Sequence, residues 1–308
     1  MRPNATTDSS GAAFHEFAWD GLSFSVPADW NLALYSYRNR VVSVRMEDDE
    51  AVRLELDWTR PPRPVEASEV SRRLEKLSEP IRRSAAATEE LRGLPPGWGA
   101  FLYTIPDGRR FIAAFHLAAG GRLFCFFRLH FDAEGGRKVP ERVFARLVSS
   151  FRVHEQGLVP WKFYDVSFRL PREFRLRSTS LMAGRKGLVF EWRLRRLHLW
   201  FFSFADMLLA GRQPEAWAVD FLRGCKAVRG PAFSLGADGA IRTRRSAAFP
   251  LGHFEELGRW SFRYRVICRH DPARNTLALA LFQHRSAADL ARLGLEFDGD
   301  TVRPAFPS

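Results

Sequence analysis

The sequence lacks long apolar runs, is poor in cysteine and lysine, and contains none of the common catalytic signatures. No uninterrupted apolar segment approaches the roughly 20 residues that a membrane-spanning helix needs. Residues 1–13 are polar and show no apolar stretch after a basic start, the pattern of a secretory signal. From these absences we expect no membrane partner and a cytoplasmic location.

Cysteine is rare and scattered. Cys125, Cys225 and Cys268 are odd in number and far apart, which argues against a disulfide framework and favours a reducing compartment. A thiolate metal site needs ligands within a few positions of each other, and none of these residues has such a partner. We therefore expect the three thiols to act as small core residues, with no metal and no cofactor.

The familiar catalytic and nucleotide-binding motifs are also missing. GxxxxGK[ST], GxGxxG, GxSxG and HExxH do not occur, so the common nucleotide-binding and hydrolase interpretations lose their support. His130 and His284 hold similar positions at the ends of two strand patterns. They could be a matched pair of ligand sites or packed strand ends, and packing is favoured because a metal needs three or four convergent ligands. We expect a protein that is not an enzyme.

What the chain does have is length, aromatic residues and positive charge. Its 308 residues suggest two domains, and 27 Phe with nine Trp supply ample apolar surface for burial. The net charge is +12, carried by 42 Arg and only five Lys. Residues 1–158 have a net charge of +1 and residues 159–308 a net charge of +11. A basic half is typical of nucleic-acid or polyanion binding, although a GC-rich genome would also enrich arginine.

The chain repeats itself. Residues 22–30 (LSFSVPADW) align without a gap with residues 166–174 (VSFRLPREF), and residues 123–130 (LFCFFRLH) with residues 277–284 (LALALFQH). A third match, Ala-Arg-Leu followed by an aromatic residue, comes later in each half. Three matches in the same order indicate a tandem duplication. We expect two copies of one domain, at 17–154 and 161–298, joined by residues 155–160.

Both copies have the same predicted order of elements, with periodicity of two in the strands and a helical apolar face in the helices. In the first copy these are a strand at 21–26, a hairpin at 41–46 and 51–58, a helix with Val70, Leu74, Leu77 and Ile81 on one face, a hairpin at 110–117 and 122–131, and a helix begun by Pro140. In the second they are a hairpin at 187–192 and 197–204, a helix begun by Pro214, a hairpin at 261–268 and 276–283, and a helix capped by Ser286 and Asp289.

Three strand patterns are apolar on both alternating faces: residues 111–117, 123–129 and 277–282. A sheet covered on both sides is the usual reason for such a pattern. Hairpins joined to their neighbours make the sheet largely antiparallel, and two helices per copy supply the cover. The predicted fold is α+β, two tandem copies of an α/β/α sandwich.

The opening stretch at residues 19–30, aromatic-x-Gly-Leu-x-Phe-x-Val-Pro-x-x-Trp, and a closing helix that ends Val148-Ser-Ser-Phe151 resemble the PsbP-like superfamily, including its LpqN-like and DcrB-like groups. The resemblance covers most of each repeat. It implies an antiparallel sheet between helices and members that mostly act as accessory or binding proteins. No catalytic residues transfer, and the family's exported members contrast with the absence of a signal here.

The basic second copy has the clearest functional pattern. Residues 261–269 alternate, so that arginines project from one face of a strand and apolar side chains from the other. If the sheet brings them together with a nearby segment and a hairpin turn, the guanidinium groups form a donor array for phosphate or carboxylate. The alternative is a solvated face with local ion pairs. The candidate anion- or partner-binding residues are Arg193, Arg195, Arg196, Arg242, Arg244, Arg245, Arg263, Arg265 and Arg269.

The turns of the first hairpins carry opposite charges in the two copies: residues 47–50 read EDDE, and residues 193–196 read RLRR. Complementary ends favour contact between copies, within a chain or between two chains, so a homo-oligomer is a further hypothesis. The leading function is a non-enzymatic interaction protein with protein partners. A nucleic-acid-binding protein that uses the basic copy is the alternative, and an enzyme or small-ligand carrier comes third.

Overall fold

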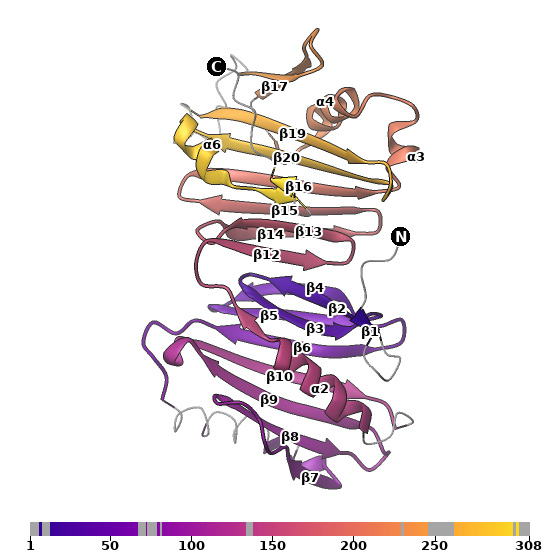
Figure 1. Cartoon of the computed structure of the whole chain (residues 1–308), viewed down its shortest axis with the longest axis vertical. Helices are drawn as coiled ribbons and strands as arrows, with labels where there is room; N and C mark the ends of the chain where they lie inside the picture. Colours follow the sequence, from indigo (N-terminus) through magenta and orange to yellow (C-terminus); the bar gives the residue numbers. More distant parts are fainter. Residues whose placement is uncertain are drawn as a thin grey trace. The chain divides into compact units, whose positions relative to one another are not determined.

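The computed structural model describes residues 6–7, 13–66, 72, 79–80, 82–133, 138–228, 231–245, 262–297 and 300–301. The chain divides into two compact units (Figure 1). The N-terminal unit comprises Arg2–Glu155 and Pro160–Ser167, and the C-terminal unit comprises Gln156–Val159 and Phe168–Ser308. The predicted boundaries of 17–154 and 161–298 differ from this division at residues 160–167.

The N-terminal unit is built mainly from antiparallel strands. They are β1 (Thr6–Thr7), β2 (Ala13–Trp19), β3 (Leu22–Pro27), β4 (Asn31–Arg38), β5 (Val41–Glu47), β6 (Val52–Thr59), β7 (Ala87–Glu90), β8 (Trp98–Thr104), β9 (Arg110–Ala118), β10 (Leu123–Phe131), β11 (Arg152–Val153) and β12 (Leu158–Phe163), with the turn η1 (Ala119–Gly121) and the helix α2 (Lys138–Ser150).

Seven strands of this unit form one antiparallel sheet in the order β4-β5-β6-β10-β9-β8-β7. A smaller sheet contains β2 paired with both β3 and β12, while β11 pairs with β3. Phe24 of β3 lies 6.3 Å from Phe127 of β10, centroid to centroid, so the small sheet and the large sheet meet through aromatic side chains. Helix α2 contacts β3, β9 and β10 and buries Val143, Phe144 and Leu147.

The C-terminal unit repeats much of this plan. Its elements are β13 (Val166–Pro171), β14 (Arg175–Met182), β15 (Arg185–Trp192), β16 (Arg195–Ser203), α3 (Ala205–Leu209), α4 (Pro214–Gly224), β17 (Pro231–Leu235), β18 (Ile241–Arg245), β19 (Arg263–Asp271), β20 (Thr276–His284), α6 (Ala287–Leu293), β21 (Glu296–Phe297) and β22 (Asp300–Thr301).

The pairings of the two units follow one order. The described five-stranded sheet of the C-terminal unit runs β14-β15-β16-β20-β19, matching β4-β5-β6-β10-β9 strand for strand. β21, which follows the closing helix, pairs with β13, just as β11 pairs with β3. Strands β17 and β18 form a separate two-stranded sheet, whereas β7 and β8 extend the large sheet of the N-terminal unit.

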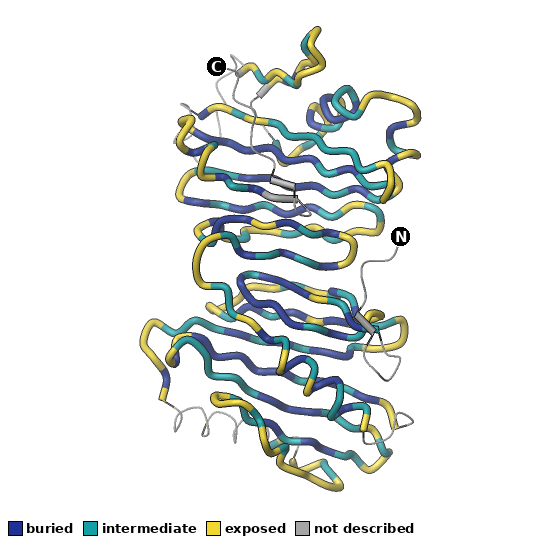
Figure 2. Tube along the Cα trace, viewed as in Figure 1, coloured by how far each residue is buried: buried dark blue, intermediate teal, exposed yellow. Residues whose placement is uncertain are grey.

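The central strand of each sheet is buried on both faces, as the two-sided apolar patterns predict (Figure 2). In the C-terminal unit, Leu277, Leu279 and Leu281 of β20 join a core with helix α4. On the opposite face, Phe282 lies 5.9 Å from Phe174. The structure is therefore α+β, with mostly antiparallel sheets and a few helices.

Several predicted elements are confirmed and several were missed. Both pairs of hairpins, α2, α4 and the capping box of α6 occur where expected. The predicted helix face of Val70, Leu74, Leu77 and Ile81 lies outside the described residues. The strands that were not predicted are β1, β2, β4, β7, β8, β11, β12, β14, β17, β18, β21 and β22. Helices alone were expected to cover the large sheet. In the N-terminal unit, the small sheet and α2 together cover one of its faces.

The aromatic centre of the N-terminal unit yields a stability prediction. Phe127 is fully buried and its ring lies 5.2 Å from Trp98 and 5.9 Å from Phe151. Replacing Phe127 with Ala should lower the free energy of unfolding by roughly 3–5 kcal/mol, because the cavity cannot fully close. Urea denaturation measures the change, with Tyr37→Ala, at a side chain that is 64% exposed, as the control. Equal losses for the two variants would contradict this packing.

Candidate functional site

The first element of the candidate site is an ion pair at the start of α6. Asp289 is buried and its Oδ1 accepts a hydrogen bond from Nη2 of Arg195 at 3.0 Å. Its Oδ2 accepts the backbone N–H groups of Arg285 and Ser286, while the Ser286 side chain accepts from the backbone of Asp289. Burial pushes the pKa of Asp289 upward, but these hydrogen bonds outweigh it, and the pKa lies below its ordinary value.

The two arginines at the start of β16 are thus held by acids of their own unit. Arg195 is committed to Asp289. Arg196 donates from Nε and Nη2 to Oε1 of Glu191, at 3.1 and 2.8 Å. Such paired guanidinium groups contribute little net charge to the surface.

Trp192 organises a second group of cations. Its indole ring is 9% exposed and lies beneath three guanidinium groups, those of Arg193, Arg195 and Arg292, at 5.7, 5.0 and 5.6 Å from the ring centroid. Arg193 is in the β15–β16 turn with φ of 54°, and Arg292 is in the last turn of α6. Cation–π contacts of this kind hold guanidinium groups in place without neutralising them.

A third group surrounds His284, at the end of β20. Arg263 pairs with His284 in the β19–β20 ladder, and Arg265 with Phe282. Arg285 lies 5.5 Å above the ring of the buried Phe262. Burial lowers the pKa of His284, and the charges of Arg263 and Arg265 lower it further, while Asp289 opposes them. The imidazole is therefore neutral at neutral pH.

These residues form one surface, which we name the α6 arginine cluster: Arg193, Arg263, Arg265, Arg285 and Arg292. All five are exposed. Within the part of the chain that the structure describes, neither Arg263 nor Arg265 has an ion pair, and Asp289, which touches this region, is already paired with Arg195. The cluster therefore concentrates positive charge around a short helix.

The other predicted arginines are not part of this cluster. Arg242 lies 3.4 Å from Asp238, Arg244 is exposed on β18, and the side chain of Arg245 lies outside the described residues. Strand β18 does adjoin β19, because Thr243 donates a hydrogen bond from Oγ1 to the backbone oxygen of Tyr264 at 3.0 Å. Arg269 is half-buried on β19.

Arg285 and Arg292 were not predicted as site residues. A signal for them exists, because Arg285 directly precedes the predicted N-cap Ser286 and Arg292 lies in the last turn of the helix that this cap begins. That Arg285 and Arg292 lie near the β19 arginines depends on the strand order of the sheet, which a local sequence pattern does not predict.

The acidic turn of the N-terminal unit is also used locally. Arg53, whose side chain is 9% exposed, donates to Asp48 and to Asp132 at 2.5 Å and lies 3.4 Å from Glu50. Asp48 and Glu50 of one turn and Arg195 and Arg196 of the other are thus paired within their own units. The hypothesis of contact through complementary turns stays a prediction.

The described residues give no support for a metal site or for a reactive thiolate at Cys125 or Cys268. No three of His, Cys, Asp or Glu lie close enough there to hold a metal ion. Burial raises the pKa of Cys125 well above its usual range and that of Cys268 to about 12, so both thiols are protonated. Cys225 is half-buried at the end of α4. No helix in the described parts is long and apolar enough to cross a membrane.

Comparison with known proteins gives a weak similarity to solved structures. No protein-family model matches the chain, and no curated protein matches it. The chain is similar to the solution structure of cyanobacterial PsbP (CyanoP) from Synechocystis sp. PCC 6803, with 18% identity, coverage of 49% of this chain and 99% of that chain, and a TM-score of 0.31. The PsbP-like resemblance is confirmed only in this weak form.

The buried carboxylate makes a testable prediction. Asp289→Ala should lower the free energy of unfolding at neutral pH by roughly 1.5–3 kcal/mol, because charge-assisted hydrogen bonds are lost. A carboxyl whose pKa is lowered on folding stabilises above its ordinary value of 3.8 and loses that contribution as the pH falls further. The difference from the parent protein should therefore shrink in acid.

Denaturation followed by tryptophan fluorescence measures this effect at neutral pH and at about pH 3. Glu173→Ala, which changes an exposed acid, serves as the control. A difference that stayed constant between the two pH values would contradict the assigned ion pair.

Proposed function

We propose that this chain is a non-enzymatic interaction protein whose C-terminal unit docks an acidic protein segment on the α6 arginine cluster. The observation that carries the proposal is the gathering of five exposed guanidinium groups around one short helix, with Asp289 already engaged by Arg195. A carboxylate-rich partner would supply the missing counter-charges, and a guanidinium group can donate two parallel hydrogen bonds to one carboxylate.

A tandem origin of the two units is part of the proposal. Besides the common strand order, a pair of equivalent arginines supports this origin. Leu129 pairs with Leu54, and Gln283, at the equivalent position of the repeat, pairs with Arg196. The residues one step earlier, Arg53 and Arg195, therefore correspond. Both are arginines in ion pairs with acids of their own unit.

The surface around the cluster favours a protein over a nucleic acid. Single-stranded nucleic acids usually stack their bases on exposed aromatic rings. Here the rings of Trp192 and Phe262 are buried beneath guanidinium groups. Leu194, 47% exposed in the same turn as Arg193, offers an apolar contact that a folded or helical protein segment could use.

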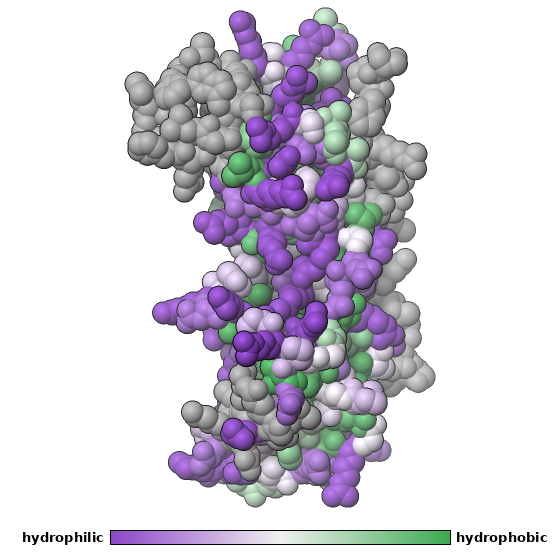
Figure 3. Space-filling view, turned by 90° about the vertical axis from the view of Figure 1, so that its left-hand side faces the viewer, coloured by the Kyte–Doolittle hydropathy of each residue, from purple (hydrophilic) through white to green (hydrophobic). Residues whose placement is uncertain are grey.

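The remaining parts of the proposal follow from the same features. Hydrophilic residues predominate on the described face in Figure 3, and hydrophobic ones form only small patches there. This composition suits a docking reaction driven by charge. Three free cysteines are consistent with the proposed cytoplasmic location. The proposed protein uses no cofactor.

The test measures binding of fluorescein-labelled poly-L-glutamate to the full chain by anisotropy. Arg263→Glu with Arg265→Glu should weaken binding by at least about tenfold, because two charges of the site change sign. Arg38→Glu with Arg40→Glu, two exposed arginines with the same spacing in the N-terminal unit, is the matched control and should leave the affinity within about twofold.

Equal weakening by both pairs would overturn the proposal, since it would mean that net charge alone sets the affinity. A single-stranded DNA oligonucleotide serves as the competitor. If it binds more tightly than poly-L-glutamate and loses its affinity in the Arg263/Arg265 variant, the cluster is a nucleic-acid site instead.

A further inference from the structure

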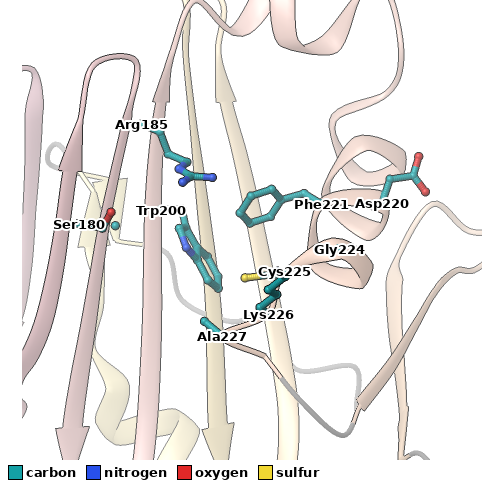
Figure 4. A pocket seen from close by; sticks show the side chains of 10 residues that line it. Ser180, Arg185, Trp200, Asp220, Phe221, Gly224, Cys225, Lys226 and Ala227 are labelled. Carbon is teal, nitrogen blue, oxygen red and sulfur yellow. The ribbon is translucent and has the colours of Figure 1, made fainter.

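A separate feature of the C-terminal unit is a cavity of about 610 Å³ between helix α4 and the sheet (Figure 4). Its lining comes from β14, β15, β16 and the end of α4. Ligand sites in proteins commonly span roughly 300–1,000 Å³ and combine apolar walls with a few polar groups. The cavity shares no residue with the α6 arginine cluster.

Two glycines line the space. Gly187 of β15 pairs with Trp200 of β16, and a Cβ at Gly187 would make an ordinary van der Waals contact with the indole, 3.4 Å from Cδ1. Gly224 closes α4, and a Cβ there would meet nothing within 4 Å. The sheet and the helix end therefore leave an opening beside the indole ring.

The walls are aromatic and held in place by their neighbours. Trp200 meets Phe221 edge to face, with 5.4 Å between ring centroids. Phe221 in turn stacks on Trp217 at 5.3 Å, and His198 stacks on Trp200 at 5.4 Å. Rings fixed on both sides form a pocket that needs no rearrangement to receive a planar aromatic group.

The mouth of the cavity is positive. Arg185 and Lys226 are exposed, and within the described residues neither has an acidic partner. Figure 4 shows the Arg185 guanidinium directed toward the space between Trp200 and Phe221. Asp220, also at this cavity, turns away in Figure 4 and pairs with Arg212 and Arg223, at 3.4 and 3.5 Å.

We propose that this cavity binds a small aromatic carboxylate, with its ring packed against Trp200 and Phe221 and its carboxylate on Arg185. Two aromatic walls favour a flat ring over an aliphatic chain, because offset and edge contacts add to burial. The Arg185 guanidinium can bind a carboxylate through two hydrogen bonds, and Lys226 adds a second positive charge.

Titration of the full chain with 2-naphthoate, followed by calorimetry, tests the site. Saturable binding of one equivalent is expected. 2-Naphthamide, which keeps the ring and lacks the charge, should bind at least about tenfold more weakly. Arg185→Gln should cause a loss of similar size, whereas Arg175→Gln, at an exposed arginine of β14 outside the cavity, should change the affinity less than twofold.

A second pair of measurements locates the bound molecule. Gly224→Trp, which places a ring over open space at the helix end, should abolish naphthoate binding without changing the unfolding temperature. The Cys225 sulfur points toward Trp200 in Figure 4, so saturating naphthoate should slow its reaction with a thiol reagent by at least about threefold. Cys225→Ser identifies the reacting thiol.

Three results would overturn the proposal: no saturable binding up to millimolar naphthoate, equal affinity for the amide, or binding that survives both Arg185→Gln and Gly224→Trp. The poly-L-glutamate assay uses other residues. A negative naphthoate result therefore leaves the proposed function intact, and a negative poly-L-glutamate result leaves the cavity proposal intact.

Discussion

Burial of a central strand on both faces is the constraint from which the rest of the structure follows. β10 and β20 are apolar along nearly their whole length, so each needs a layer above and below its sheet. In the C-terminal unit α4 provides one layer and Phe174, beside Phe282, marks the other. In the N-terminal unit α2 and the small sheet cover the face that carries Phe127, and Val65 packs with Phe124 and Phe126 on the other face.

Covering the sheets in this way restricts the positions that charged side chains can occupy. Arg53 enters the covered region beside Asp48, and Arg195 beside Asp289. The exposed arginines of the cluster lie on β19, in the β15–β16 turn, and on or beside the short helix α6. These positions lie close together around α6, so arginines that are far apart in the sequence gather there.

The sequence predicts the parts of this fold that have local causes. Period-two hairpins, the proline-started α4 and the Ser286–Asp289 capping box each depend on a few neighbouring residues, and all are present. Strand β14 was missed because it is an edge strand with mostly exposed side chains, formed by pairing with β15 and not by burial. Such a strand has no clear apolar period to detect.

The candidate site was predictable only in outline. The charge asymmetry and the alternation on β19 pointed to Arg263 and Arg265, which remain in the cluster. The pattern could not show that Arg195 and Arg196 are taken by Asp289 and Glu191, because those acids meet them through tertiary packing and strand pairing. The cavity beside α4 could not be predicted for the same reason, since strand pairing brings Gly187 beside Trp200 and tertiary packing brings the end of α4 to both.

If the C-terminal unit presents its charge for docking at one place, an acidic polymer should protect that place and leave the rest of the chain unchanged. Hydrogen exchange of the full chain, with and without poly-L-glutamate, measures this because every backbone amide reports its own protection. We expect slower exchange around residues 192–196, 262–266 and 284–293 and no change around the acidic turn at 48–51. Protection spread evenly over both units, or confined to the N-terminal unit, would contradict it.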